Sequence, residues 1–153
     1  MSRQTSAIIN LIIEHNIKES AINSKSKAIA AAQASLEKKA SDVIILELTE
    51  LTAIANYFVI CSAENTTQVK AIAEQIEESL KRVYMRPFRV EGFEYAHWVL
   101  IDYGDVIVHV FEQETRAFYA LEKFWLDAPR IPFDENDTDA IVVGGSYQRS
   151  QPR

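Results

Sequence analysis

Two aspartates, Asp102 and Asp105, stand on either side of a predicted two-residue turn. Paired carboxylates can bind a divalent metal ion, as they do in enzymes that transfer nucleotidyl or phosphoryl groups. Those enzymes also need a phosphate-binding loop, usually a glycine-rich one that leads into a helix N-terminus. The candidate loop at residues 62–65 has no glycine, and Glu64 would repel phosphate. A metal-dependent nucleotidyl or phosphoryl transferase therefore stays open only as the alternative function.

The histidines and the cysteine form no recognisable catalytic set. His97 and His109 fall on opposite faces of the predicted strands, so they do not share metal-ligand spacing. Cys61 is the only cysteine and lies in the apolar run YFVIC, where a small buried side chain is expected. Glu91 precedes a turn glycine and is expected to be a surface acid. We therefore predict no catalytic residues, no metal ligands and no cofactor.

The two aspartates are positioned by a predicted β-hairpin. Its strands cover residues 97–102 and 105–111, which are rich in β-branched and aromatic residues. Gly104 in the turn can adopt a positive φ without steric cost. If Asp102 pairs with Asp105, the register sets Ile101 opposite Val106, Val99 opposite Val108, and Trp98 opposite His109.

Alternation along the strands gives this hairpin two different faces. One is a core face and carries Val99, Ile101, Val106, Val108 and Val110. The other mixes aromatic rings with carboxylates and an imidazole, and carries Trp98, Leu100, Asp102, Asp105, Ile107, His109 and Phe111. Such a mixture is typical of an interaction surface. The alternative is that a helix covers this second face and that both aspartates are only polar turn residues.

The flanking elements complete one mixed α/β domain at residues 25–128, with a mixed sheet of about five strands packed with helices. We predict one helix over residues 25–40 and a last helix from Glu112 to before Pro129. A helix between them opens at Asn65, which forms a capping box with Gln68. The predicted strands before the hairpin are 43–48, 57–62 and the short edge strand 88–91. In the last helix, Phe118, Leu121 and Trp125 fall on one face. Residues 1–24 are expected to be an appendage with a short helix and a polar linker, ESAINSKS, and residues 129–153 a flexible acidic and polar tail.

The charge and the apolar pattern exclude several classes of protein. The net charge of −6 argues against a broad nucleic-acid surface and favours a basic or apolar patch on any large partner. No apolar run approaches the roughly 20 residues that cross a bilayer. The N-terminus does not read as a secretory signal, and the single cysteine fits a reducing compartment. We expect a cytoplasmic protein without a membrane partner.

The residues around the hairpin carry a resemblance to a known family. The string VEGFEYAHWVLIDYGDVIVHVFEQETRAFYALEKFWLDAP resembles the ribosomal silencing factor family, also called Iojap-related. The family pattern is E-G, then W before a hydrophobic pair, then D-x-G-D-V-x-V-H-V-F and R-x-x-Y-x-L-E-x-x-W. The strings KKASDVIILEL and NYFVICSA match its first two strands, so the resemblance covers about residues 36–129. Asn56 and Ala63 depart from the aspartate and glycine usual there.

The resemblance implies a non-catalytic role and a fold of nucleotidyltransferase-like topology. It implies binding to the large ribosomal subunit through its L-fourteen-type protein, which blocks joining of the small subunit and represses translation when nutrients are short. Ribosome assembly without silencing is a further alternative, and family members can form dimers. Aromatic residues would contribute buried area, and aspartates would pair with basic residues of the partner. The expected docking residues are Trp98, Asp102, Asp105, His109, Phe111, Arg116 and Tyr119.

Overall fold

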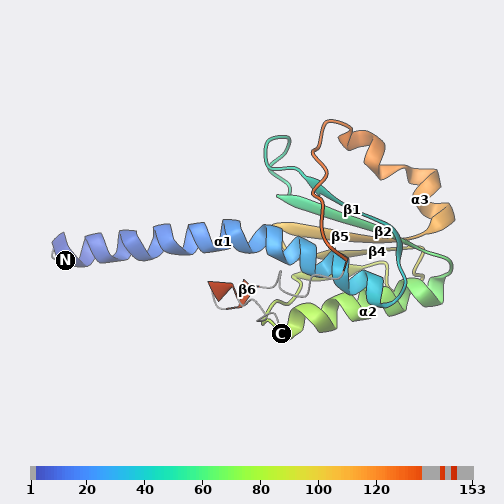
Figure 1. Ribbon diagram of the computed structural model, residues 1–153, viewed down its shortest axis with the longest axis horizontal. Coiled ribbons are helices and arrows are strands. Elements are labelled where there is room, and N and C mark those ends of the chain that lie inside the picture. The colour runs from blue at the N-terminus through green and yellow to red at the C-terminus, as the bar shows by residue number, and fades with distance from the viewer. Residues whose placement is uncertain (1–2, 136–141, 144–145, 148–153) are drawn as a thin grey trace.

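A five-stranded mixed sheet forms the centre of the molecule (Figure 1). The computed structural model describes residues 3–135, 142–143 and 146–147. The strand order is β1-β2-β5-β4-β3, and β2 and β5 are the parallel pair. The bounds are β1 Ser41–Glu47, β2 Tyr57–Ala63, β3 Arg89–Glu91, β4 Trp98–Asp102 and β5 Val106–Glu112. The prediction of a single mixed α/β domain with about five strands is confirmed.

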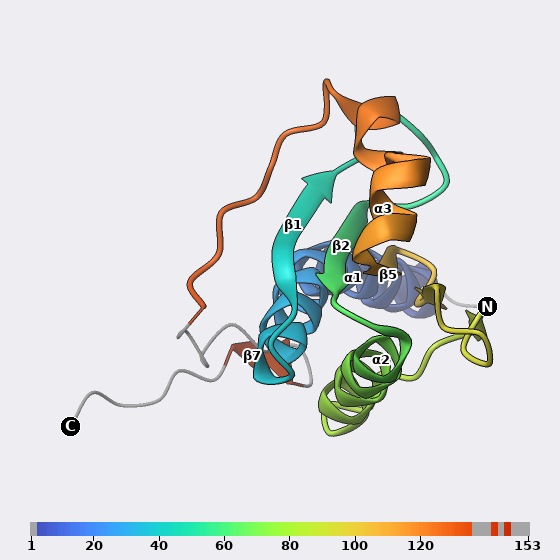
Figure 2. The same cartoon turned by 90° about the vertical axis from the view of Figure 1, so that its right-hand side faces the viewer.

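Helices lie on both faces of this sheet (Figure 2). The helices α1 Arg3–Glu37 and α2 Thr66–Lys81 pack on the face that holds Val99, Ile101 and Val108. The short helix α3 Gln113–Tyr119 and the 3-10 turn η1 Leu121–Trp125 lie over the opposite face. That second face buries Phe58, Ile60 and Phe111, with Leu121 and Trp125 packed against them. No helix in the described ranges is long and apolar enough to cross a membrane.

The first helix is longer than the sequence predicts. The polar run at residues 19–26, expected to be a linker, is helical throughout, so the prediction of a break before residue 25 is wrong. The run contains neither glycine nor proline, and the other residue types cost a helix only fractions of a kcal/mol each. In Figure 1, α1 extends well beyond the sheet toward the N-terminus. Exposed apolar side chains line its described outer part: Ile8, Ile9, Leu11 and Ile12.

The hairpin forms, but its register differs by two residues from the predicted one. Ile101 pairs with Val108, Val99 with Val110, and Trp98 with Phe111. The turn lies one residue later than expected, because the Tyr103 N–H donates to the Val106 carbonyl at 2.9 Å. Gly104 adopts φ 86° in this turn and donates its N–H to Asp102 Oδ1 at 2.7 Å. A shift of two keeps the residues of β4 and β5 on their predicted faces, since the side-chain period is two. Asp105, predicted to begin the second strand, lies in the turn instead.

The capping of α2 follows the prediction, with one change of partner. Asn65 Oδ1 accepts the N–H of Gln68 at 2.9 Å, and Gln68 Oε1 reaches back to the N–H of Glu64 at 2.7 Å. Val69, Ile72, Ile76 and Leu80 are buried as expected.

The predicted last helix is instead broken at Ala120. This residue has φ 47° and ψ 50°, which ends α3 and starts η1 in a new direction. Leu121 and Trp125 pack on the sheet, but Phe118 is 81% exposed. The prediction that Phe118 shares their buried face is therefore wrong, because the helical periodicity does not continue through the left-handed residue.

Residues after η1 cover the outer edge of β1. The Glu47 N–H donates to the Pro129 carbonyl at 2.9 Å, and the Ile131 N–H donates to the Ile45 carbonyl at 2.9 Å. Residues 129–131, predicted to begin the tail, are thus hydrogen-bonded to the sheet. Further on, β6 Val142–Val143 pairs with β7 Ser146–Tyr147. The rest of the predicted flexible tail, residues 136–141, 144–145 and 148–153, lies outside the described residues.

Candidate docking surface

Four aromatic rings run from the sheet out to solvent, and we call Phe111, Trp98, Tyr119 and Phe118 the aromatic ladder. Trp98 stacks on Phe111 with ring centroids 4.7 Å apart and meets Tyr119 at 5.1 Å. Tyr119 in turn contacts Phe118 edge-on at 5.1 Å. Phe111 is fully buried, Tyr119 is 51% exposed and Phe118 is 81% exposed. The ladder therefore holds its two outer rings in water on a fully packed base.

His109 lies beneath Trp98 and is buried. Trp98 Nε1 donates to His109 Nδ1 at 3.1 Å, and the His109 ring packs edge-on against Phe58 at 4.6 Å. Burial in this apolar layer lowers the pKa of His109 to about 4, so the imidazole is neutral at pH 7. Because Nδ1 accepts the indole proton, Nε2 carries the imidazole hydrogen. His109 is thus a positioning partner for Trp98 and offers no surface of its own to a protein.

The depressed pKa of His109 predicts a loss of stability in mild acid. The unfolded chain takes up a proton on this imidazole near pH 6.5, whereas the folded chain does so only near pH 4. The free energy of unfolding should therefore fall by a few kcal/mol between those values. His109→Leu should remove this pH dependence while lowering stability at pH 7. Urea titrations at pH 7 and pH 4.5 measure the free energy of unfolding at each pH. If the variant loses as much stability between these pH values as the wild type does, His109 is not the cause.

Arg116 fixes α3 and η1 to the sheet. Its Nη1 donates to the Asp42 carbonyl at 2.7 Å and to Ser62 Oγ at 2.8 Å. Its Nε donates to Glu122 Oε1 at 2.6 Å, and its side chain is only 12% exposed. One guanidinium thus joins β1, β2, α3 and η1. The geometry makes Arg116 a support of the ladder, with its Nε and Nη1 donors already used inside the molecule.

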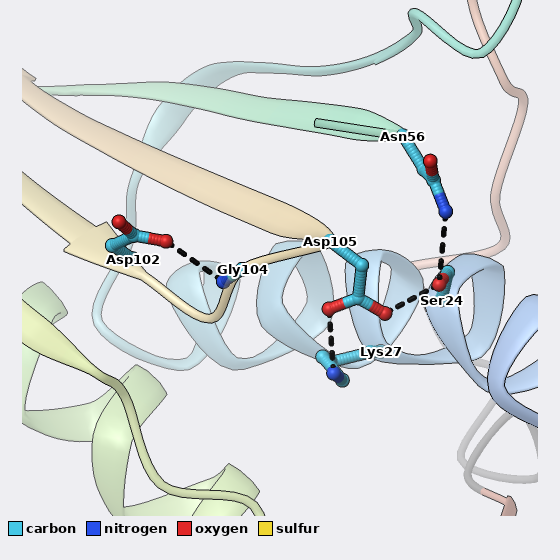
Figure 3. Close-up of polar contacts among 6 residues, drawn as sticks. All are labelled: Ser24, Lys27, Asn56, Asp102, Gly104 and Asp105. Carbon is cyan, nitrogen blue, oxygen red and sulfur yellow. Dashed lines mark hydrogen bonds and ion pairs between the residues drawn. The ribbon is translucent and has the colours of Figure 1, made fainter. Parts of the chain in front are cut away.

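The two aspartates of the turn point to different places (Figure 3). Asp102 accepts the Gly104 N–H and pairs with Arg89 Nε at 3.0 Å. Asp105 accepts from Ser24 on α1 and pairs with Lys27 Nζ at 2.7 Å. The prediction that Asp105 lies on the same face as Trp98 is therefore wrong, because the shifted turn directs it toward α1. Each of the four carboxylate oxygens therefore already has a hydrogen-bond or ion-pair partner.

We expect Asp105 to anchor the inner part of α1. Asp105→Ala should remove one acceptor of the buried Ser24 and the carboxylate that pairs with Lys27, and cost about 1–3 kcal/mol of folding free energy. Amide hydrogen exchange should rise locally around residues 24–30. Asp102→Ala is the matched control, because it removes the neighbouring turn carboxylate without touching α1. Equal exchange in both variants would count against this anchor.

No group of three or more His, Cys, Asp or Glu among the described residues could hold a metal ion. Cys61 is buried, and burial raises the pKa of its thiol to about 12, so it is not a thiolate at neutral pH. His97, just before β4, has a side chain that is 61% exposed, and its Nδ1 lies 2.7 Å from Glu112 Oε2. His97 therefore has a carboxylate partner, whereas Nε2 of the buried His109 has no hydrogen-bond partner among the described residues.

The structure divides the seven predicted docking residues. Trp98 and Tyr119 lie on the accessible side of the ladder, and Phe111 is its buried base. His109 lies beneath Trp98, and Arg116 is mostly enclosed. Sequence reasoning missed three strongly exposed apolar side chains of α3, η1 and the residue that follows, namely Phe118, Phe124 and Leu126. The assumption of one continuous amphipathic helix concealed them. The only signal in the sequence was the large number of apolar residues between Phe118 and Leu126, which is more than one face of a helix can bury, and it does not say which of them are exposed.

A sequence model described as "Ribosomal silencing factor during starvation" matches residues 21–151. The chain belongs to this family. The ribosomal silencing factor RsfS of Bacillus subtilis is 41% identical over 113 residues, which are 74% of this chain and 96% of that protein. A crystal structure from Bacillus halodurans matches with a TM-score of 0.61 and 38% identity, covering 68% of this chain and 94% of that one.

The name of a more distant relative refers to ribosome assembly. The mouse protein named "Mitochondrial assembly of ribosomal large subunit protein 1" is 28% identical over 92 residues, covering 58% of this chain and 40% of that protein. The predicted family membership is thus confirmed by the family match and by the bacterial relatives. The matched residues 21–151 include the whole sheet, α2, α3 and the aromatic ladder.

Proposed function

We propose that this member of the ribosomal silencing factor family binds the large ribosomal subunit through the L-fourteen-type ribosomal protein. Bound there, it blocks joining of the small subunit by its bulk and represses translation under nutrient limitation. It acts in the cytoplasm, as a binding protein and not as an enzyme. Family membership supports the ribosomal role, and the aromatic ladder is the single structural observation that supports docking through this face.

The ladder has the properties of an interface anchor. Tyrosine, tryptophan and other aromatic side chains supply large contact areas at low conformational cost and concentrate binding energy at interfaces. Tyr119 is held by its contact with Trp98, and the Arg116 bonds fix the backbone of α3 that carries Tyr119 and Phe118, so these elements lose little freedom on binding. Phe124 and Leu126, also strongly exposed, enlarge the apolar area that α3 and η1 offer.

The charge of the chain suits a basic partner. The net charge is −6, and Asp102 on the Trp98 face lies at a 17% exposed position beside Arg89. Opposite net charges speed encounter and select against acidic competitors more than they add affinity. We therefore assign affinity to the aromatic ladder and orientation to the acidic side chains. Asp105 is left out of this assignment because α1 occupies it.

Sedimentation with purified ribosomal subunits tests the proposal. The protein should migrate with large subunits, and adding it before small subunits should reduce the fraction of joined ribosomes. Binding to the isolated L-fourteen-type protein should account for the affinity. Sedimentation equilibrium of the protein alone tests the dimer that the resemblance implies. Migration with large subunits without any change in joining would refute the steric block.

Assembly of the large subunit is a second candidate, because the name of the mouse relative describes it. Gradient profiles of cells lacking the protein separate the two roles. An assembly factor predicts precursor particles during rapid growth, whereas a silencing factor predicts excess joined ribosomes only during starvation. Calorimetry with magnesium and nucleoside triphosphates tests the remaining alternative, a transferase, for which a measurable binding heat is required.

A further inference from the structure

The connection from α2 to β3 concentrates positive charge and aromatic rings. Residues 81–89 read KRVYMRPFR and hold four of the 16 Lys and Arg residues of the chain, with no Asp or Glu among them. We call this stretch the basic aromatic segment. The chain as a whole has a net charge of −6, so the segment is a local reversal of sign and not part of a broad basic surface.

The charges and rings of this segment face solvent. Tyr84 is 89% exposed and Phe88 is 82% exposed. Of its four cations, Arg89 pairs with Asp102 and Glu91. Among the ion pairs of the described residues, none uses Lys81, Arg82 or Arg86. Three exposed cations are therefore available to a ligand.

Tyr84 occupies a backbone position that normally suits glycine. It has φ 64° and closes the C-terminus of α2, where its N–H donates to the Lys81 carbonyl at 3.0 Å. A residue with a Cβ is strained in this left-handed conformation, and the exposed ring gains almost no burial in exchange. The strain at Tyr84 is thus not offset by burial of its ring, which leaves the ring free to contact a ligand.

Phe88 is presented on a rigid base at the other end of the segment. Its N–H donates to the Asp102 carbonyl at 2.7 Å, which joins it to the end of β4. Its ring lies over the turn glycine, because a Cβ built on Gly104 would come within 2.8 Å of Phe88 Cε2. The ring is thus fixed on one side and open on the other.

We propose that the basic aromatic segment binds single-stranded RNA. Lys81, Arg82 and Arg86 would contact phosphates, and unpaired bases would stack on Tyr84 and Phe88. Exposed flat rings between unpaired cations suit this ligand better than a membrane, which favours a continuous aliphatic face. The inference deepens the proposed function, since an unpaired loop of large-subunit rRNA would supply the RNA.

Fluorescence anisotropy with a labelled 12-nucleotide oligouridylate, and with protein-free large-subunit rRNA, tests this with the full chain. Three phosphate contacts predict that log K falls with log salt with a slope of about −2. Arg82→Ala with Arg86→Ala should reduce the slope to about −0.7 and weaken binding at least ten-fold at low salt. Lys25→Ala with Lys38→Ala is the matched control, because both lysines are exposed and lie outside the segment.

Tyr84→Gly separates a binding defect from a folding defect. Removing the strained Cβ should leave Tm unchanged or raise it by up to about 4 °C. Loss of the stacking ring should weaken RNA binding by roughly five-fold to a hundred-fold. A stable variant with weak RNA binding supports the proposal. RNA binding at the wild-type level in both variants overturns it, as does binding to phosphatidylserine vesicles without binding to RNA.

The two proposals fail separately. Phe118→Ala should abolish binding to the isolated ribosomal protein but not binding to oligouridylate, because Phe118 lies on α3 and not in the segment. Tyr84→Gly should weaken binding to oligouridylate but leave binding to the isolated ribosomal protein unchanged. Binding of the ribosomal protein with no RNA binding by the wild type at 50 mM salt rejects the RNA site alone.

Discussion

Phe118→Ala is expected to weaken binding to purified large ribosomal subunits by about thirty-fold to several hundred-fold without altering Tm. The loss follows from removing a central aromatic anchor, for which truncation costs about 2–4 kcal/mol of binding free energy. The fold should tolerate the change, because the side chain is 81% exposed and contacts only its neighbour Tyr119 among the rings. Surface plasmon resonance with immobilised large subunits gives the dissociation constant, and a thermal melt gives Tm.

Leu11→Ala serves as the matched control for this prediction. Leu11 is 64% exposed and lies in the N-terminal part of α1. Removing it should leave the dissociation constant within about two-fold of the wild-type value. If Phe118→Ala binds as tightly as the wild type, the docking face is not the aromatic ladder.

Arg116→Met is expected to cause the largest loss of stability, about 3 kcal/mol of unfolding free energy. The change leaves Glu122 without its cation and removes the bonds to Asp42 and Ser62 in a mostly enclosed site. A loss of that size should lower Tm by roughly 10 °C in a chain of this length. Arg89→Met is the control, because its pairs lie on the surface, where such a contact contributes about 1 kcal/mol or less.

The effect of Arg116→Met should also depend on pH. Burial raises the pKa of Glu122, but a bond to its own backbone and the Arg116 guanidinium outweigh that and hold the pKa below its usual value of 4.5. A carboxylate with a lowered pKa stabilises the fold above the unfolded value and loses that contribution as the pH falls through the folded value. The difference between wild type and variant should therefore be greatest above pH 4.5 and shrink below it. A constant difference would place the stabilisation elsewhere.

The strands could be read from the sequence because they combine β-branched runs with alternation. The two faces of the hairpin were also predictable, since any even shift in register preserves them. The register itself was not, because a glycine at position 104 suits a turn centred either before or after it. That one-residue ambiguity moved Asp105 from the predicted docking face to α1.

Other features of the site depend on contacts between distant residues. Alanine is the best helix former, so the sequence around Ala120 does not predict the left-handed conformation with which this residue separates α3 from η1. The role of Arg116 depends on Asp42 and Ser62, which join it only after the sheet has formed. The exposure of Phe118 follows from both features and could not be derived from periodicity alone.

The parallel pairing of β2 with β5 has a consequence for synthesis of this protein. Every residue of β2 is buried, and Tyr57 finds its partner only when Val106 is available. A nascent chain that has emerged only as far as α2 therefore carries an apolar strand paired on one side, by β1 alone. Such non-local pairing slows folding and leaves an unpaired strand edge that can aggregate with other chains. We expect the domain to complete its fold late in translation, after the hairpin has left the exit tunnel.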